Sequence, residues 1–325
     1  MLFKTITEIK EFLPIGVGND FDRLKPHIAN AENKYIKPLL GTPMYDELQE
    51  FYEAEYPVEP NDAQIATKEL LGKVQHATIH LAYFIGFDFL NASISDAGFQ
   101  RVESERSKGL YKYQEDNLRE YFSDSGFNTL DDVLVFMESN IAYFNEFKLH
   151  ENYTVLKQSF LPTLAEVEKI PYNLFGSRLI FLALKPHFAY AEDTDIKPIL
   201  GETIYNTVKT EMVKDAPSAA VLALLPYIRK PLIYLAAALL MEETGGILGD
   251  KGLYFRKTNA TYPGNKIKGP STEEVVARRV GNERMKAAGY LEALKAELIE
   301  KWEEYNGQIG RIPNRDNTDK KTFWA

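Results

Sequence analysis

Two copies of one phrase decide the fold of this chain: LKPHIANAENKYIKPLLGTPMY at residues 24–45 and LKPHFAYAEDTDIKPILGETIY at residues 184–205. Thirteen of the 22 aligned positions are identical, at a constant offset of 160 residues. That period is far longer than the roughly 20–50 residues of a solenoid repeat. The repeat therefore predicts that a whole domain was duplicated, with copy one in residues 1–150 and copy two in residues 151–325.

The prolines and glycines of the repeated phrase predict where its helices begin and end. A residue before proline is pushed towards extended backbone, and proline is tolerated in the first turn of a helix. We therefore expect a helix that begins at Pro26, ends near Pro38 and stops at Gly41, before a second helix capped and opened by Thr42-Pro43. The same geometry applies to copy two. The motif consists of Pro26, Ala31, Glu32, Ile36, Leu40 and Gly41 in copy one, and of Pro186, Ala191, Glu192, Ile196, Leu200 and Gly201 in copy two.

A long apolar helix follows the phrase in each copy. Asn61 with Gln64 three residues later predicts a capping box, and Ser218 predicts the N-cap of the second copy. Apolar residues then recur at spacings of three and four, which is typical of a buried helical stripe. Sustained alternation of apolar and polar residues is scarce, so the fold class is predicted as mainly α: two related helical-bundle domains from an internal duplication.

The copies differ most after the long helix. Copy one has residues 91–109 there, whereas copy two has a longer, glycine-rich loop at 245–270 whose LYF segment favours a small β-hairpin. Beyond the loop we expect a C-terminal pair of helices in each copy, because Gly126-Phe127 and Gly289-Tyr290 each precede an apolar-periodic stretch. A connecting helix is expected near residues 145–172, and a polar C-terminal tail at 307–325.

Composition narrows the class of protein. The formal net charge is −9. An acidic protein repels the phosphate backbone of DNA unless its lysines and arginines are gathered on one face. The absence of cysteine excludes disulfides and thiolate zinc sites. The first residues do not resemble a signal peptide, and the most apolar run, LIYLAAALLM, is about half as long as a membrane span. We expect a soluble intracellular protein with no membrane partner.

Catalytic motifs are missing. His27 and Glu32 recur as His187 and Glu192, and a repeated His and Glu could serve a metal or acid–base site. Five residues apart on a helix they lie about 140° apart around its axis, which favours structural roles. With no phosphate loop, nucleophile elbow or HExxH motif, we expect no catalytic residue, metal, cofactor or small-molecule ligand. A polar pocket carrying Glu32 or His27 in both copies would instead indicate an enzyme.

Two basic segments are candidate partner surfaces. The loop RKTNATYPGNKIK (256–268) suits nucleic acid or an acidic partner, or else is a solvated loop. The tail is a disordered arm, or its terminal aromatic pair anchors in a neighbour's groove. The candidate interface residues are Arg256, Lys257, Tyr262, Lys266 and Lys268 in the loop, and Arg311, Arg315, Phe323 and Trp324 in the tail.

The motif residues, together with the stretch from Phe89 to Phe122, resemble a family of helical virion proteins from Bacteroides-group phages and prophages. The resemblance covers most of copy one but only the phrase and closing helices of copy two. It implies a head–tail connector, a neck-ring adaptor in the virion that is assembled in the bacterial host cytoplasm. Its implied partners are further copies in a homo-oligomeric ring, the portal, tail or neck proteins, and DNA passing non-specifically through the channel. The alternative is a nucleic-acid-binding packaging or replication protein that uses the copy-two loop and the tail.

Overall fold

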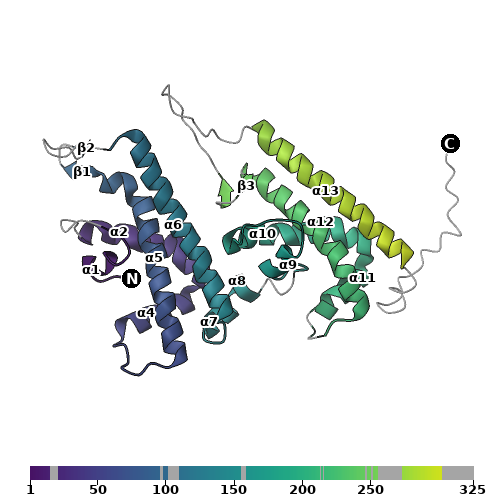
Figure 1. The fold of residues 1–325 in the computed structure, drawn as a ribbon, viewed down its shortest axis with the longest axis horizontal. Helices are drawn as coiled ribbons and strands as arrows, with labels where there is room; N and C mark the ends of the chain where they lie inside the picture. Colours follow the sequence, from purple (N-terminus) through teal and green to yellow (C-terminus); the bar gives the residue numbers. More distant parts are fainter. Residues whose placement is uncertain are drawn as a thin grey trace. The chain divides into compact units, whose positions relative to one another are not determined.

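The computed structural model describes residues 1–14, 21–95, 98–101, 110–154, 159–212, 214, 216–245, 247–249, 252–254 and 273–301. The chain divides into two compact units, Met1–Thr154 and Val155–Ala325. Within the described ranges both units are built mainly from α-helices, each with one short two-stranded sheet (Figure 1). The prediction of a mainly α fold made of two related helical domains is confirmed.

The two units repeat one order of elements. Unit one contains α1 (Ile6–Ile9), α2 (Phe21–Ala31), the π-helix η1 (Glu32–Ile36), α3 (Lys37–Leu40), α4 (Thr42–Glu53), α5 (Asp62–Leu90), β1 (Ala92–Ser95), β2 (Gly98–Arg101), α6 (Lys112–Ser139), α7 (Asn145–Leu149) and α8 (Glu151–Thr154). Unit two contains α9 (Leu164–Glu168), α10 (Arg178–Ala191), the π-helix η3 (Glu192–Ile196), α11 (Lys197–Met212), α12 (Ala219–Thr244), β3 (Ile247–Gly249), β4 (Gly252–Tyr254) and α13 (Glu273–Glu300).

The first helix of the phrase begins earlier than the sequence predicts. α2 starts at Phe21, so Pro26 lies inside it, and α10 likewise contains Pro186. Leu24 and Ile28 are both buried on the face that α2 packs against α5. In a helix, residues four apart share a face, so helical backbone before the proline allows Leu24 to be buried together with Ile28. The predicted start at Pro26 and Pro186 is wrong.

The predicted helix end at Pro38 is also wrong, because a π-helix carries the chain past it. The N–H of Lys37 donates to the carbonyl of Glu32, five residues back, which is the π spacing. Pro38 then lies in the first turn of α3, where a missing N–H costs little. Copy two repeats this arrangement between Glu192 and Lys197.

The glycine stop is confirmed in both copies: Gly41 separates α3 from α4, and the non-helical backbone of Gly201 divides α11 into two helical parts. Gly41 has φ of 83° and Gly201 has φ of 72°, values that L-residues with a side chain rarely adopt. Thr42 is the first residue of α4 and not its cap, since Gly41 precedes the helix and supplies no side chain. The phrase is therefore a helix with a π turn, a glycine corner and a second helix.

The long helices α5 and α12 are the central elements of their units. The side chain of Asn61 accepts the Gln64 N–H at 2.9 Å while that of Gln64 accepts the Asn61 N–H at 3.0 Å, so the predicted capping box is confirmed. Ser218 caps α12 as predicted. By length and composition α12 is apolar enough to cross a membrane, but 56% of its most apolar window is buried within the unit, as in a core helix.

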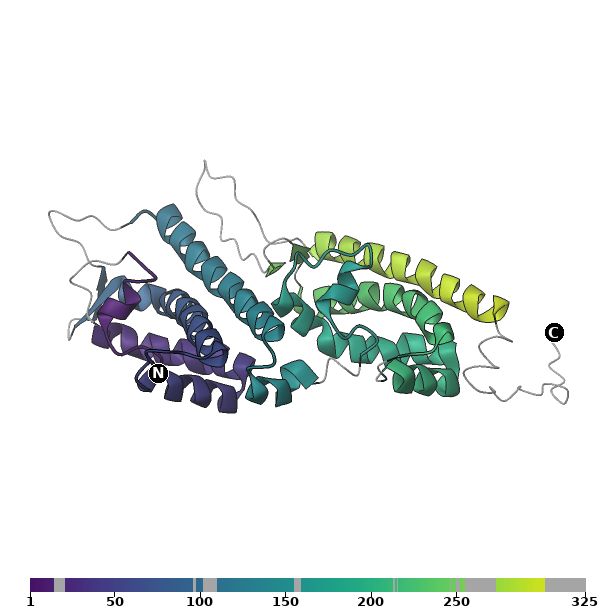
Figure 2. The same ribbon diagram turned by 60° about the horizontal axis from the view of Figure 1, so that its bottom comes forward.

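In each unit one long helix, α6 or α13, stands in place of the predicted pair of helices. α6 packs along α5, and α13 packs along α12 (Figures 1 and 2). A Cβ on Gly126 would lie 2.7 Å from the Leu81 side chain, so this glycine permits close approach of α6 to α5 and does not break the helix. Gly289 likewise lies inside α13.

Each unit has a β-hairpin between its two long helices. β1 pairs with β2 antiparallel, with Ala92 opposite Arg101, and β3 pairs with β4, with Ile247 opposite Tyr254. The hairpin predicted in the copy-two loop is confirmed. The expected connecting helix near residues 145–172 is replaced, in the described part, by the short helices α7, α8 and α9.

Candidate functional site

The repeated glutamate of the phrase is buried and binds main chain. In unit one, Glu32 is 3% exposed, and its Oε1 accepts the N–H of Leu2 at 2.7 Å. From α5, Gln75 Nε2 donates to the carbonyl of the same Leu2 at 2.6 Å. The backbone N–H of Leu2 is thus bound by η1, and its carbonyl is bound by α5. We call this arrangement the main-chain clamp.

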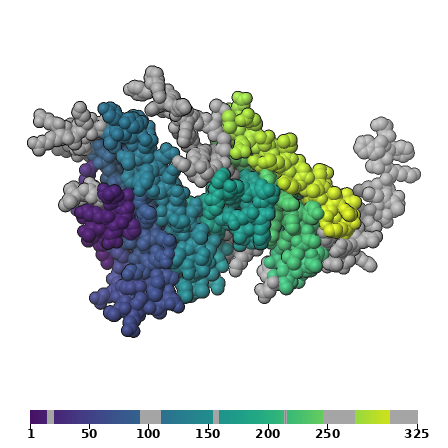
Figure 3. Space-filling view, viewed as in Figure 1, coloured from purple at the N-terminus to yellow at the C-terminus, as the bar shows by residue number. Residues whose placement is uncertain are grey.

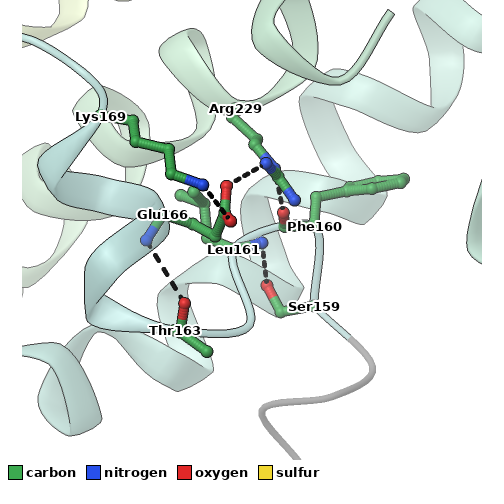
Figure 4. A network of polar contacts seen from close by, with 7 residues as sticks. All are labelled: Ser159, Phe160, Leu161, Thr163, Glu166, Lys169 and Arg229. Carbon is green, nitrogen blue, oxygen red and sulfur yellow. Dashed lines mark hydrogen bonds and ion pairs between the residues drawn. The ribbon is translucent and has the colours of Figure 1, made fainter. Parts of the chain in front are cut away.

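Unit two contains the same main-chain clamp. Glu192 Oε1 accepts the Phe160 N–H and the Ser159 hydroxyl, each at 2.8 Å. Arg229 on α12 donates from Nε to the Phe160 carbonyl at 2.8 Å (Figure 4). In both units the π-helix places a buried carboxylate opposite a long, polar side chain of the central helix. The clamp fixes the segment that enters each unit.

The positive charge beside the two carboxylates has different origins. The ammonium group of Lys209 forms an ion pair with Glu192. At the offset of 160 residues, Gln49 occupies the place of Lys209 in copy one. The amino group of Met1 lies 3.9 Å from Glu32 Oε2 and donates to Gln49 Oε1 at 3.0 Å. Each buried carboxylate therefore has a cation nearby, which a buried charge requires.

Polar contacts extend from the unit-two clamp into α9. Arg229 also pairs with Glu166, which accepts a hydrogen bond from Lys169 at 2.7 Å (Figure 4). Burial alone would raise the pKa of the Glu166 carboxyl, but the cationic Lys169 and Arg229 hold it below its usual range. Thr163 caps this helix by accepting the Glu166 N–H at 3.3 Å. The network ties α9 to α12 and stabilises the clamped segment.

The repeated histidines lie apart from the clamps. His27 packs on Gly86 of α5, where a Cβ would come 2.6 Å from its Cγ. His187 Nε2 lies 3.5 Å from Glu243 Oε2 on α12, beside an open depression of about 510 Å³ that Tyr190 also lines. Among the described residues, no group of three or more His, Asp or Glu could hold a metal ion. The depression contains His187 but neither repeated glutamate, so it does not match the polar pocket that would indicate an enzyme.

Large apolar side chains stand exposed on the N-terminal half of α6. Tyr111 immediately precedes this helix and is 70% exposed, Leu118 is 38% exposed and Tyr121 is 52% exposed. Their spacings of seven and three put them on one side of a helix, and α6 lies on the surface of unit one (Figure 3). Tyr113, 51% exposed, stacks on Tyr111 with ring centroids 6.0 Å apart. We call Tyr111, Tyr113, Leu118 and Tyr121 the α6 aromatic face.

Two histidines of α5, the buried His80 and the half-buried His76, lie next to Tyr121 of this face. The ring of Tyr121 is 5.8 Å from that of His80, which is 1% exposed and 4.5 Å from the His76 ring. His80 Nδ1 lies 2.9 Å from the His76 carbonyl, and Phe12 stacks on the far side of His76. Burial lowers the pKa of both imidazoles. The pair is therefore neutral near pH 7 and packs as part of the core.

The predicted partner residues lie outside the described ranges, so the structure neither brings them together nor separates them. These are Arg256, Lys257, Tyr262, Lys266, Lys268, Arg311, Arg315, Phe323 and Trp324. The α6 aromatic face was not predicted. Its signal was present in the sequence as the seven-and-three spacing of Tyr111, Leu118 and Tyr121, but exposure depends on which elements cover the helix.

The chain matches a known protein family. A family model described as a family of unknown function (DUF6712) matches the chain twice, over residues 36–156 and 196–310. The two matched segments cover more than half of the chain and correspond to the two units, in agreement with the duplication. Neither a curated protein nor a solved structure matches the chain.

Proposed function

Since the chain belongs to the family of unknown function (DUF6712) and carries its module twice, we propose that it is a structural subunit that assembles with copies of itself. More finely, we propose a head–tail connector of a tailed phage, a ring subunit below the portal. This role requires rigid helical units and a surface that binds neighbours, and it requires no catalytic residue.

The observation that carries the assembly proposal is the α6 aromatic face. Tyr111 and Tyr121, each more than half exposed, lie with Leu118 on one side of α6, and Tyr113 stacks on Tyr111. Aromatic residues are enriched in the buried centres of protein interfaces, where they contribute much of the binding energy. Contiguous exposed apolar patches on soluble proteins commonly mark such interaction sites. A protein–protein contact at this face therefore fits the chemistry of its residues.

The finer proposal rests on the resemblance of the repeated phrase to helical virion proteins and on two compatible features. Contacts between two different surfaces of one chain close into a ring when the rotation between subunits allows it. The net charge of −9 also suits a channel wall along which DNA must slide without being held.

Electron microscopy of the purified chain, alone and mixed with a portal protein of a tailed phage, tests the connector proposal. We expect ring-shaped particles, and particles attached to the portal in the mixture. A chain that remains a featureless monomer at high concentration and with the portal present would contradict the proposal.

Nucleic-acid binding is the second candidate, favoured by the four bases and one tyrosine of residues 256–268. Binding of a labelled duplex measured at low salt, and then over increasing salt, tests it. Neutralising Arg256, Lys257, Lys266 and Lys268 together should abolish the binding if this segment is responsible. No binding at low salt would remove this candidate.

A further inference from the structure

We propose that the α6 aromatic face of one molecule binds the C-terminal segment, residues 307–325, of a second copy of the chain. The proposal names the occupant of the surface on which the proposed function depends, and so it rests on that function. It predicts a head-to-tail contact, in which each copy offers a face and inserts a segment.

The N-terminal part of α6 contains more acidic than basic residues. The bases of the helix in this region are already engaged: Lys112 Nζ lies 2.8 Å from Asp116 Oδ1, and Arg119 pairs with Asp88. Residues 112–124 include two basic residues and four acidic residues, which are Glu115, Asp116, Glu120 and Asp124. An aromatic face on a helix segment with an excess of acidic residues is complementary to a partner that carries both cations and aromatic rings.

Residues 307–325 have this chemistry. The segment holds four bases, Arg311, Arg315, Lys320 and Lys321, against two acids, Asp316 and Asp319. Phe323 and Trp324 follow directly after the last two bases. Trp and Arg are among the residues that most often dominate interface energetics, and both interact favourably with the faces of tyrosine rings. Charge complementarity and aromatic content therefore point to the same surface.

The length of the segment permits the contact. α13 ends at Glu300, and 24 residues follow Lys301 in the chain. Fully extended, that length reaches up to about 80 Å, which exceeds the roughly 42 Å of a 28-residue helix such as α6. An arm of this reach can cross to a neighbouring molecule and lie along part of its α6.

Two full-length variants test the two sides of the contact one at a time. The arm variant carries Phe323→Ser and Trp324→Ser, and the face variant carries Tyr111→Ser and Tyr121→Ser. The control carries Tyr190→Ser and Leu222→Ser, which alter side chains of comparable exposure in unit two. Circular dichroism checks that each variant folds. By light scattering we expect self-association of the arm and face variants to weaken about tenfold or more, and that of the control to match the unaltered chain.

Mixing the variants tests whether the contact joins two molecules. The arm variant keeps its face and the face variant keeps its arm, so a one-to-one mixture should form a heterodimer that neither variant forms alone. If the arm docks on the α6 of its own chain, the mixture stays monomeric and the proposal is wrong.

A peptide separates failure of this contact from failure of the proposed function. A dye-labelled peptide of residues 307–325 should bind the arm variant saturably, bind more weakly as salt is raised, and lose about tenfold in affinity when the face substitutions are added. Equal binding with and without the face substitutions, or equal binding of a scrambled peptide, overturns the proposal. An unaltered chain that assembles while both variants assemble equally well also overturns it, yet leaves the proposed assembly intact.

Discussion

Removing the buried carboxylate of the unit-two clamp should destabilise that unit strongly. In Glu192→Ala, the Phe160 N–H and the Ser159 hydroxyl lose their acceptor, and Lys209 loses its counter-ion. Phe160 is fully buried, so its N–H lies away from bulk solvent. The main-chain clamp would then hold Phe160 only through Arg229.

The magnitude follows from the groups that are left without a partner. A buried donor without an acceptor costs roughly 1–3 kcal/mol, and removing one member of a buried ion pair costs about 3–5 kcal/mol. The Lys209 side chain is 22% exposed and can partly rehydrate, which reduces the second cost. We expect Glu192→Ala to lower the free energy of unfolding by about 3–5 kcal/mol, and Glu192→Gln, which keeps an acceptor, by about 1–2 kcal/mol.

Urea denaturation followed by circular dichroism measures the loss, and hydrogen exchange at the Phe160 amide locates it. Exchange is needed because two units do not have to unfold in one transition. Glu202→Ala is the matched control, since it removes an exposed carboxylate from α11, the helix that follows η3, and should cost less than about 0.5 kcal/mol. If Glu192→Ala matches Glu202→Ala in stability, or leaves exchange at Phe160 unchanged, the structural role assigned to the clamp is wrong.

Two further predictions concern unit-specific packing. Alanine at Gly41 must adopt a positive φ and would place its Cβ 2.5 Å from the His150 ring, whereas alanine at Gly201 meets only the backbone cost of about 1–2 kcal/mol. In denaturant unfolding, Gly41→Ala should therefore lower the free energy of unfolding more than Gly201→Ala does. Equal losses of stability in the two variants would contradict this. Burial lowers the pKa of His80 below its ordinary 6.5, so the unfolded chain binds the proton more readily and the stability of unit one falls as the pH drops through about 6.5. His80→Phe should reduce that fall, measured as the shift in urea midpoint between about pH 7.5 and 5.5, and an unchanged shift would contradict the assignment.

The parts of the fold that depend on local backbone preferences could be predicted. The glycine corner at Gly41 follows from the need for a positive φ, and the capping box at Asn61 follows from the exposed N–H groups of a helix start. The predicted helix start at Pro26 failed because burial of Leu24 outweighs the local preference of a residue near proline. The π turn at Glu32 also escaped prediction, since sequence periodicity of 3.6 residues does not register a single wider turn.

The candidate site was less predictable because it depends on contacts between distant segments. The clamp joins Leu2 to side chains about 30 and 73 residues away, and neither repeated phrase alone indicates that a main-chain N–H is the partner of Glu32. The α6 aromatic face is local in sequence, but only the packing of α5 against one side of α6 leaves Tyr111 and Tyr121 exposed.

The central claim is that this duplicated chain is an assembly subunit acting through the α6 aromatic face. The most direct measurement is the molar mass of the full-length chain by light scattering over a wide concentration range, beside the variant carrying Tyr111→Ser and Tyr121→Ser. We predict that the unaltered chain rises well above the 37.1 kDa of one copy, while the variant remains near that mass at the same concentrations. An unaltered chain that stays at the mass of one copy, or a variant that assembles equally well, would contradict the claim.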